Sequence, residues 1–287
     1  MMTTPLVQGA LLILLSEWAL VASGIIIRQL SDHLPTEVLV FLRNSLGLLW
    51  MLPWMIRKGR RGLPTQRLHL HLLRALVGVT AMSCLYYAWA NLTLAQAALL
   101  KQTSPFFVPI IAFFWLQERI NAAVRWAILV GFMGVMLILQ PGTASFSLAV
   151  VVALVGAALG ATAKVCIRAM RSTESPQQIV FYFALFGSLF AAIPAWNSWV
   201  MPGATDWLWL LALAAASTLA QLLLSRAYGL AGAGVLGPFT YASIPFAALA
   251  GWLIWDESLG WLTLGGMALV VLGGMLTLRG QAKARAG

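Results

Sequence analysis

Two proline-interrupted apolar stretches decide the fold: ALLKQTSPFFVPIIAFFWLQE at residues 98–118 and YASIPFAALAGWLIWDES at residues 241–258. The prolines are Pro105 and Pro109 in the first stretch and Pro245, with Pro238 just upstream, in the second. Because proline lacks an N–H and clashes with the carbonyl four residues earlier, it frees backbone groups of a helix. In a bilayer those groups need partners from protein or trapped water, so such segments line cavities. Ordinary kinked helices would explain either stretch alone, but matched breaks in two halves indicate a transporter's binding site.

The composition indicates an integral membrane protein. Of the 287 residues, 61% are hydrophobic and only 9% are charged, whereas soluble domains carry about 25% charged residues. The apolar runs are continuous rather than alternating, which argues against a β-barrel. Ten of them reach the length of roughly 17–25 residues that a membrane helix needs: 8–28, 36–56, 70–90, 94–116, 121–140, 146–168, 177–198, 205–227, 233–255 and 260–279. The sequence therefore predicts an all-α protein with ten transmembrane helices.

The Lys and Arg residues predict the orientation in the membrane. Of the 18 basic residues, 15 fall in connections or ends on the side that would hold both termini. Such an excess marks the cytoplasmic side of a membrane. We therefore expect an inner-membrane protein whose N- and C-termini are both cytoplasmic. The formal net charge of +10 is then a topology signal in contact with the lipid bilayer, and it does not indicate a nucleic-acid partner.

Similar residues recur at a nearly constant spacing along the chain. Pairs that lie 139 residues apart include Glu118 and Glu257, Gly134 and Gly273, and Met136 and Met275, while Arg28 and Arg168 lie 140 apart. We interpret this spacing as two five-helix halves, residues 1–141 and 142–287. Because five is odd, the second half would enter the membrane in the opposite orientation. The sequence therefore predicts an inverted repeat around a central cavity.

Three segments resemble the drug/metabolite transporter superfamily, in particular its EamA-type members with two repeats. They are PTEVLVFLR at 35–43, ALLKQTSPFFVPIIAFFWLQERI at 98–120 and IPFAALAGWLIWDESLGWLTLGGMALVVLGG at 244–274. The resemblance covers essentially the whole chain. It implies a secondary carrier for metabolites, similar to amino-acid exporters of the YddG kind, in which the last helix of each half lies beside the core. The chain departs from the family pattern at Arg43, which has Ala184 as its counterpart, and at Lys101.

Charged residues within the predicted spans are candidates for substrate contact, because a charge at the centre of a bilayer costs at least about 2.5–3.5 kcal/mol. Glu17 and Lys101 differ in depth by about 6 Å at the rise of an α-helix, so we expect them to pair across the cavity. Arg43 lies at a depth similar to that of Lys101, and it either faces the cavity or extends to the outer surface. Three basic residues near span ends are expected to extend to the membrane surface: Arg74, Lys164 and Arg226.

Polar and aromatic residues near these charges complete the candidate site. The further substrate-binding candidates are Trp18, Tyr86, Tyr87, Gln102 and Tyr241, whereas Trp89 is typical of an interfacial anchor. Pro105, Pro109, Pro238 and Pro245 are expected to shape and gate the cavity. The sequence contains no zinc-protease, nucleotide-binding or catalytic-triad motif, and nothing in it indicates a metal or a cofactor. We therefore do not expect an enzyme.

The sequence predicts a secondary transporter that exports small metabolites by alternating access. Amino acids, including aromatic or apolar ones, fit best, because a zwitterion could place its carboxylate at Lys101 or Arg43 and its ammonium at Glu17. Export is implied by the family resemblance alone. The alternatives are a passive channel or facilitator, a drug or other-metabolite carrier of the same fold, and an intramembrane enzyme or lysine-linked pigment protein. The oligomeric state is not predicted, and a monomer would suffice.

Overall fold

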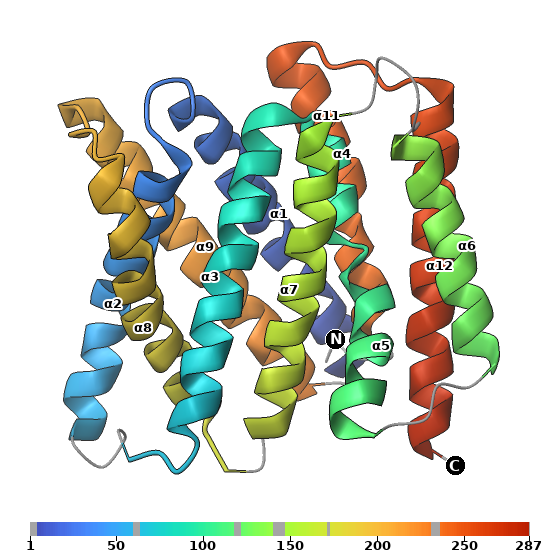
Figure 1. The fold of residues 1–287 in the computed structure, drawn as a ribbon, viewed down its shortest axis with the longest axis horizontal. Helices are drawn as coiled ribbons and strands as arrows, with labels where there is room; N and C mark the ends of the chain where they lie inside the picture. The colour runs from blue at the N-terminus through green and yellow to red at the C-terminus, as the bar shows by residue number, and fades with distance from the viewer. Residues whose placement is uncertain are drawn as a thin grey trace.

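The computed structural model describes residues 5–59, 64–117, 122–139, 147–170, 173–230 and 236–286, which form helices joined by short connections (Figure 1). The first half contains α1 (Pro5–Leu30), α2 (Thr36–Lys58), α3 (Leu68–Asn91), α4 (Leu94–Lys101), α5 (Ser104–Leu116) and α6 (Ala122–Leu139). The second half contains α7 (Leu148–Met170), α8 (Pro176–Asn197), α9 (Ala204–Leu230), the 3₁₀ helix η2 (Gly237–Ala242), α11 (Ser243–Trp255) and α12 (Trp261–Ala286).

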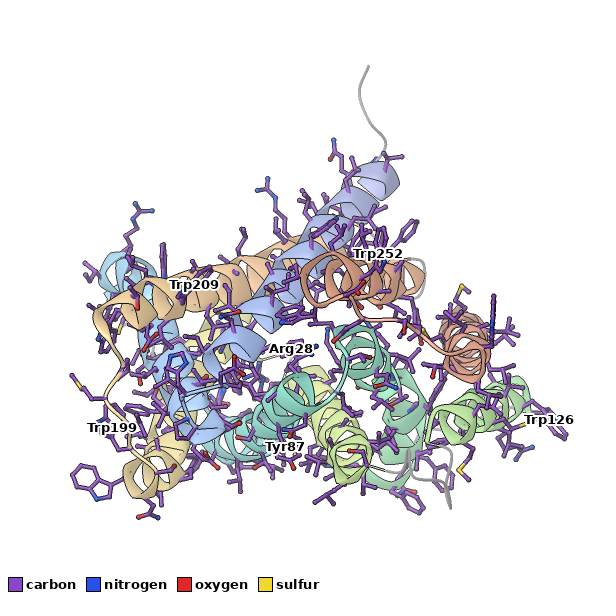
Figure 2. All side chains as sticks on the ribbon, turned by 90° about the horizontal axis from the view of Figure 1, so that it is seen from above. Arg28, Tyr87, Trp126, Trp199, Trp209 and Trp252 are labelled. Carbon is purple, nitrogen blue, oxygen red and sulfur yellow. The ribbon has the colours of Figure 1, made fainter. Side chains whose placement is uncertain are left out.

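Several of these segments are suited to crossing a bilayer. Within the described ranges, seven are long and apolar enough, with α4 and α5 counted together, and three shorter apolar stretches lie in α6, in η2 with α11, and in α12. Each of the ten predicted ranges overlaps one of them, and the count of ten crossings stays a prediction. The chain is a helical membrane protein with multiple spans. Large side chains cover its outside, as with Trp126 and Trp199, which are 69% and 44% exposed at opposite edges of the molecule (Figure 2).

The first apolar stretch is broken, as the sequence indicated, but most of the four prolines stand at the start of a helix rather than inside one. α4 ends at Lys101 and a new helix begins at Ser104, so the first stretch is broken rather than kinked. Three of the four prolines stand in the first turn of a helix: Pro105 in α5, Pro238 in η2 and Pro245 in α11. Proline suits that turn because its missing N–H would have no helical partner there. Only Pro109, of these four, lies inside a helix.

The two halves repeat each other in their helix boundaries. The bounds of α5 shifted by 139 residues, 104–116 to 243–255, are the bounds of α11. Both helices end at a non-glycine residue in the left-handed region, Gln117 with φ 56° and Asp256 with φ 53°, which also lie 139 apart. Such backbone conformations are uncommon for residues other than glycine. The shared exception indicates that the sequence repeat is also a structural repeat.

α6 and α12 pack against each other at one side of the molecule, as the family resemblance implies (Figure 1). Glycine allows their backbones to come close. A Cβ atom at Gly273 would lie 2.6 Å from the backbone N of Gly131, and one at Gly134 would lie 2.6 Å from the carbonyl O of Gly266. Membrane helices gain little from hydrophobic burial against each other, so close packing of small residues stabilises such pairs.

Replacing Gly273 with Ala should therefore destabilise the protein, because the added Cβ meets backbone atoms that cannot rotate away. We expect a cost of about 1–3 kcal/mol, typical of an overpacked site, measured as a lower melting temperature of the detergent-purified protein. Gly265→Ala on the same helix is the matched control, since a Cβ there meets nothing within 4 Å. Equal melting temperatures for the two variants would contradict the packing argument.

Candidate functional site

A cavity of about 280 Å³ lies among α1, α2, α3, α4, α5, α7 and α9. This volume is close to the lower end of the range for small-molecule sites. Its lining on α7 consists of Ala153, Gly156, Ala157, Gly160 and Lys164, a spacing that keeps all five on one helical face. Small residues on this face leave room for a ligand. In the described parts of the chain, no group of three or more His, Cys, Asp or Glu residues is placed to hold a metal ion.

Hydroxyl groups fasten α1 to α9 on the wall of this cavity. The Ser16 hydroxyl donates to the carbonyl of Ala220 at 2.7 Å, and the Ser23 and Ser217 hydroxyls lie 3.3 Å apart. Glu17 follows Ser16 directly, lines the cavity and is only 3% exposed. The two serine contacts therefore fix the face of α1 that presents the carboxylate.

The predicted proximity of Glu17 and Lys101 is confirmed. Lys101 Nζ lies 3.6 Å from Glu17 Oε2, and both residues line the cavity. Lys101 is the last residue of α4, where the partial negative charge of the helix end favours a cation. Glu17 Oε2 finds no hydrogen-bond donor among the described residues. The carboxylate can therefore still accept a hydrogen bond from a ligand.

Two basic residues expected at the membrane surface are placed differently. Lys164 lines the cavity, and its Nζ donates to Ser104 Oγ at 3.0 Å. Arg74 is 8% exposed, and its guanidinium carbon lies 4.2 Å from the centre of the Phe183 ring. The surface prediction was wrong for Arg74, which is buried, whereas Lys164 is exposed but also faces the cavity. Distance from a helix end does not tell which neighbour a side chain faces.

The structure places Arg43 at the cavity rather than at the outer surface. The residue is 5% exposed and lines the cavity together with Tyr86. Its Nη1 donates to Asn44 Oδ1 at 3.2 Å, while Nε has no partner among the described residues. Of the two alternatives that the sequence left open for Arg43, the cavity position is therefore the one found.

One end of the cavity is closed by an aromatic side chain. Trp89 lines the cavity and is 3% exposed, and a Cβ at Gly24 would lie 3.0 Å from its ring. The close fit of Trp89 on α1 therefore depends on glycine at this position. Lys164 in contrast is exposed. The cavity is open at the end where Lys164 lies and closed at the end where Trp89 lies.

A charged contact, the Arg28–Glu257 clasp, lies one helical turn beyond this closed end. Glu257 forms an ion pair with Arg28 and accepts a hydrogen bond from the backbone N of Leu94 at 3.1 Å. Leu94 begins α4, so the carboxylate also meets the positive end of that helix. The Arg28 guanidinium lies 4.6 Å from the centre of the Trp255 ring, and Figure 2 shows Arg28 near the middle of the molecule, between the helices. The clasp joins α1 and α4 of the first half to the segment after α11.

Gln102 and Tyr241, both expected to contact substrate, do not line the cavity and instead connect the two helix breaks. Gln102 Nε2 donates to the carbonyl of Thr240 at 2.6 Å and to Ser243 Oγ at 2.9 Å. Tyr241 Oη donates in return to the carbonyl of Gln102 at 3.4 Å. These two residues lie 139 apart and are thus equivalent positions of the repeat. The 139-residue spacing was the one sequence signal that could have identified this brace.

Two aromatic candidates also lie away from the cavity lining. Trp18 is 43% exposed and stacks on Phe246 of α11 with 4.6 Å between ring centres. Tyr87 is half-buried and packs against the apolar core that contains Trp89. Neighbouring residues on a helix point in different directions, so Glu17 and Tyr86 face the cavity while Trp18 and Tyr87 do not.

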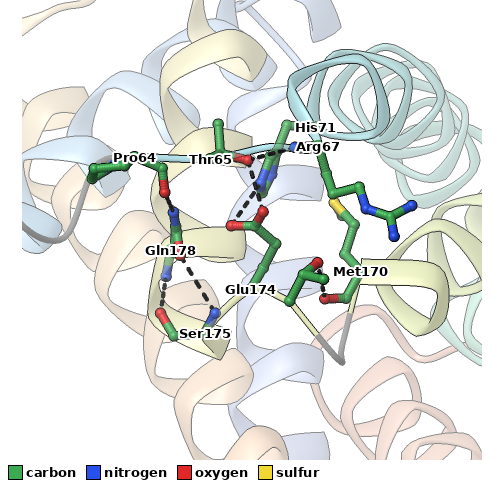
Figure 3. Close-up of polar contacts among 9 residues, drawn as sticks. Pro64, Thr65, Arg67, His71, Met170, Glu174, Ser175 and Gln178 are labelled. Carbon is green, nitrogen blue, oxygen red and sulfur yellow. Dashed lines mark hydrogen bonds and ion pairs between the residues drawn. The ribbon is translucent and has the colours of Figure 1, made fainter.

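A second polar cluster lies outside the cavity, where the segment before α3 meets the α7–α8 connection (Figure 3). Glu174 accepts a hydrogen bond from Thr65 Oγ1 at 2.8 Å, and its Oε2 lies 3.6 Å from His71 Nε2. Gln178 Nε2 donates to the carbonyl of Pro64 at 2.7 Å. None of these residues lines the cavity. The cluster fastens the first half to the second.

A broken-helix core with a charged cavity closed at one end defines a membrane transporter rather than a receptor or a structural membrane protein. The chain belongs to the EamA-like transporter family, whose model matches residues 7–140 and again residues 147–279.

Relatives in this family carry several kinds of cargo. The chain is 34% identical over 267 residues to the pseudopaline exporter CntI of Pseudomonas aeruginosa, covering 92% of this chain and 94% of that one. It is 33% identical over 275 residues to a riboflavin transporter of Vibrio cholerae, with 92% and 91% covered. It is 25% identical to an S-adenosylmethionine uptake transporter of Rickettsia bellii, with 92% and 90% covered. A solved crystal structure of a protein 19% identical in sequence shares the fold, with a TM-score of 0.64 over 93% of this chain and 96% of that one.

Replacing Gln102 with Leu should lower stability, because two hydrogen bonds across the helix breaks are lost in a setting with little water to replace them. We expect about 1–3 kcal/mol, seen as a lower melting temperature in detergent. Gln96→Leu on α4 is the control, since no side-chain hydrogen bond of Gln96 is found in the described residues. If both variants melt alike, the brace does not hold the breaks together.

Proposed function

We propose that this protein is a secondary carrier that exports small, amino-acid-like metabolites across the inner membrane by alternating access. The observation that supports this most is the pairing of Glu17 and Lys101 in the cavity at 3.6 Å, with Lys164 held by the neighbouring Ser104. A carboxylate and two ammonium groups within one small cavity are suited to the two charged ends of a zwitterion.

The contacts of these residues indicate how such a ligand would bind. A ligand ammonium would donate to Glu17 Oε2, which lacks a donor among the described residues. A ligand carboxylate would accept from Lys101 and Lys164. Hydrogen bonds between charged groups are about twice as strong as neutral ones. The ligand would therefore replace the Glu17–Lys101 ion pair without leaving either charge uncompensated.

The closed end of the cavity favours a carrier over a passive channel, since a channel needs a continuous path. In the proposed arrangement, ten spans form two inverted halves, residues 1–141 and 142–287, with both termini in the cytoplasm. The open end, where Lys164 lies, would then face the cytoplasm and accept cargo. Release would require Trp89 to move and the Arg28–Glu257 clasp to separate.

The direction of transport is proposed from the relatives. A 34% identical relative is named as an exporter, while a 25% identical relative is named as an uptake transporter. Export is therefore the direction that we propose, and the cargo of this chain need not be that of any relative.

The proposal is tested by counterflow of a panel of radiolabelled amino acids and amino-acid conjugates in proteoliposomes. We expect Lys101→Met to fold but to lose at least about tenfold of the flux of carboxylate-bearing substrates, since one charged hydrogen bond contributes about 1.5–3 kcal/mol. The double variant Glu17→Gln with Lys101→Met should fold and stay inactive. Arg125→Gln, on an exposed part of α6, is the control.

Two results would count against this function. Absence of counterflow for every amino acid and conjugate by the wild-type protein would overturn the substrate class. Recovery of both yield and flux in the double variant would show that the Glu17–Lys101 pair is structural.

A further inference from the structure

We propose that the cavity selects substrates with a second carboxylate, and that Arg43 is the residue that recognises it. This inference deepens the proposed function and rests on it. The substrate class would then be amino acids or amino-acid conjugates that carry a distal carboxylate in addition to the amino-acid group.

The charges that line the cavity do not balance. Glu17 contributes one negative charge, while Arg43, Lys101 and Lys164 contribute three positive charges. Among the described residues, the one ion pair in the cavity joins Glu17 to Lys101, and neither Arg43 nor Lys164 forms an ion pair with a carboxylate. The cavity thus carries a formal charge of +2, and an anionic ligand would offset it.

The surplus positive charge of the cavity is divided between two groups of residues. Glu17, Lys101 and Lys164 form one group, linked by the 3.6 Å ion pair and by the Lys164–Ser104 hydrogen bond. This group has a net charge of +1 and suits the ammonium and carboxylate of an amino acid, as described above. Arg43 forms the other group by itself, also with a charge of +1.

Contacts between helices show that Arg43 lies well away from Lys164. Asn44, next to Arg43, reaches Met82 Sδ with its amide N at 3.6 Å. Gly156 of α7 lies at the same level, since a Cβ there would be 2.6 Å from Cys84 Cβ. Lys164 is eight residues further along α7, or about 12 Å at the rise of an α-helix. Arg43 therefore lies roughly two helical turns from Lys164 along the cavity, toward the closed end.

Arg43 forms no ion pair with a carboxylate among the described residues, so its charge is available to an anionic ligand. The residue is 5% exposed, its Nε has no hydrogen-bond partner among the described residues, and its Nη1 donates to the neutral amide oxygen of Asn44. A buried charge without a counter-charge is strongly unfavourable. The planar guanidinium matches a carboxylate with two parallel hydrogen bonds. A neutral isostere of the same substrate would leave this charge uncompensated and would be rejected.

The test compares isosteric pairs that differ by one carboxylate: glutamate with glutamine, and alanylglutamate with alanylglutamine. Binding is measured as the ligand-dependent shift in melting temperature of purified protein, and transport as competition in counterflow. For the wild-type protein we expect the carboxylate member of at least one pair to be preferred by about tenfold or more, as one charge-assisted contact allows.

Variants assign this preference to a residue. Arg43→Gln should bind the two members of a pair alike, while Arg43→Lys should keep part of the preference, because the charge stays but the two parallel hydrogen bonds of the guanidinium are lost. Lys164→Gln should weaken both members by a similar factor, because it belongs to the group that holds the amino-acid part. Arg125→Gln on α6 should match the wild type. If Arg43→Gln does not fold, the role of Arg43 is judged by comparing the preference for the carboxylate member in the wild-type protein and in Arg43→Lys.

The outcomes separate the two proposals. Equal binding and flux of both members by the wild-type protein would overturn the second-carboxylate inference and leave amino-acid transport standing. A preference that persists in Arg43→Gln would remove Arg43 from its role. Binding without any flux would instead contradict the proposed function, and no binding of any of the four compounds would contradict the second-carboxylate inference.

Discussion

The structure depends on one constraint: where a helix breaks inside a membrane, protein groups must satisfy the backbone that the break frees. Here the break between α4 and α5 and the break before α11 satisfy each other, since Gln102 donates across to Thr240 and Ser243 and Tyr241 donates back to Gln102. Because α4 can end there, Lys101 stands at a helix end and Ser104 at a helix start. The chain therefore delivers a cation and a hydroxyl into the cavity at the same point.

The features that follow from depth in the membrane and from spacing along the chain could be predicted from the sequence. Counting residues at the rise of a helix brought Glu17 and Lys101 to similar depths, and the 139-residue offset matched equivalent helix bounds. The direction in which each side chain points around its helix axis could not be predicted in the same way. Lys164 and Arg43 point toward the cavity while Trp18 and Tyr87 do not, because this direction depends on which neighbouring helices each helix packs against. Gln102 and Tyr241 showed the right position near the breaks, but only tertiary contacts show that they face each other.

Charge and space in the cavity are provided by different residues. The small residues of α7 and the hydroxyl contacts between α1 and α9 make an opening without supplying charge. The charges come from α1, α2, α4 and, on α7, from Lys164. A substitution that changes the size of the cavity can therefore leave its charge intact, and the reverse also holds. Such a division is consistent with a family whose relatives are named for chemically different cargoes.

The Arg28–Glu257 clasp gives the closed end a property that Trp89 alone would not give. The Arg28 side chain is 26% exposed and that of Glu257 is 8% exposed, so dissolved ions can approach the pair from the compartment beyond it. Attraction between partly exposed charges weakens as ionic strength rises, since the Debye length falls from about 10 Å at 0.1 M to about 3 Å at 1 M. In the proposed transport cycle, the ionic strength of the medium that this end faces would therefore affect how readily the end opens.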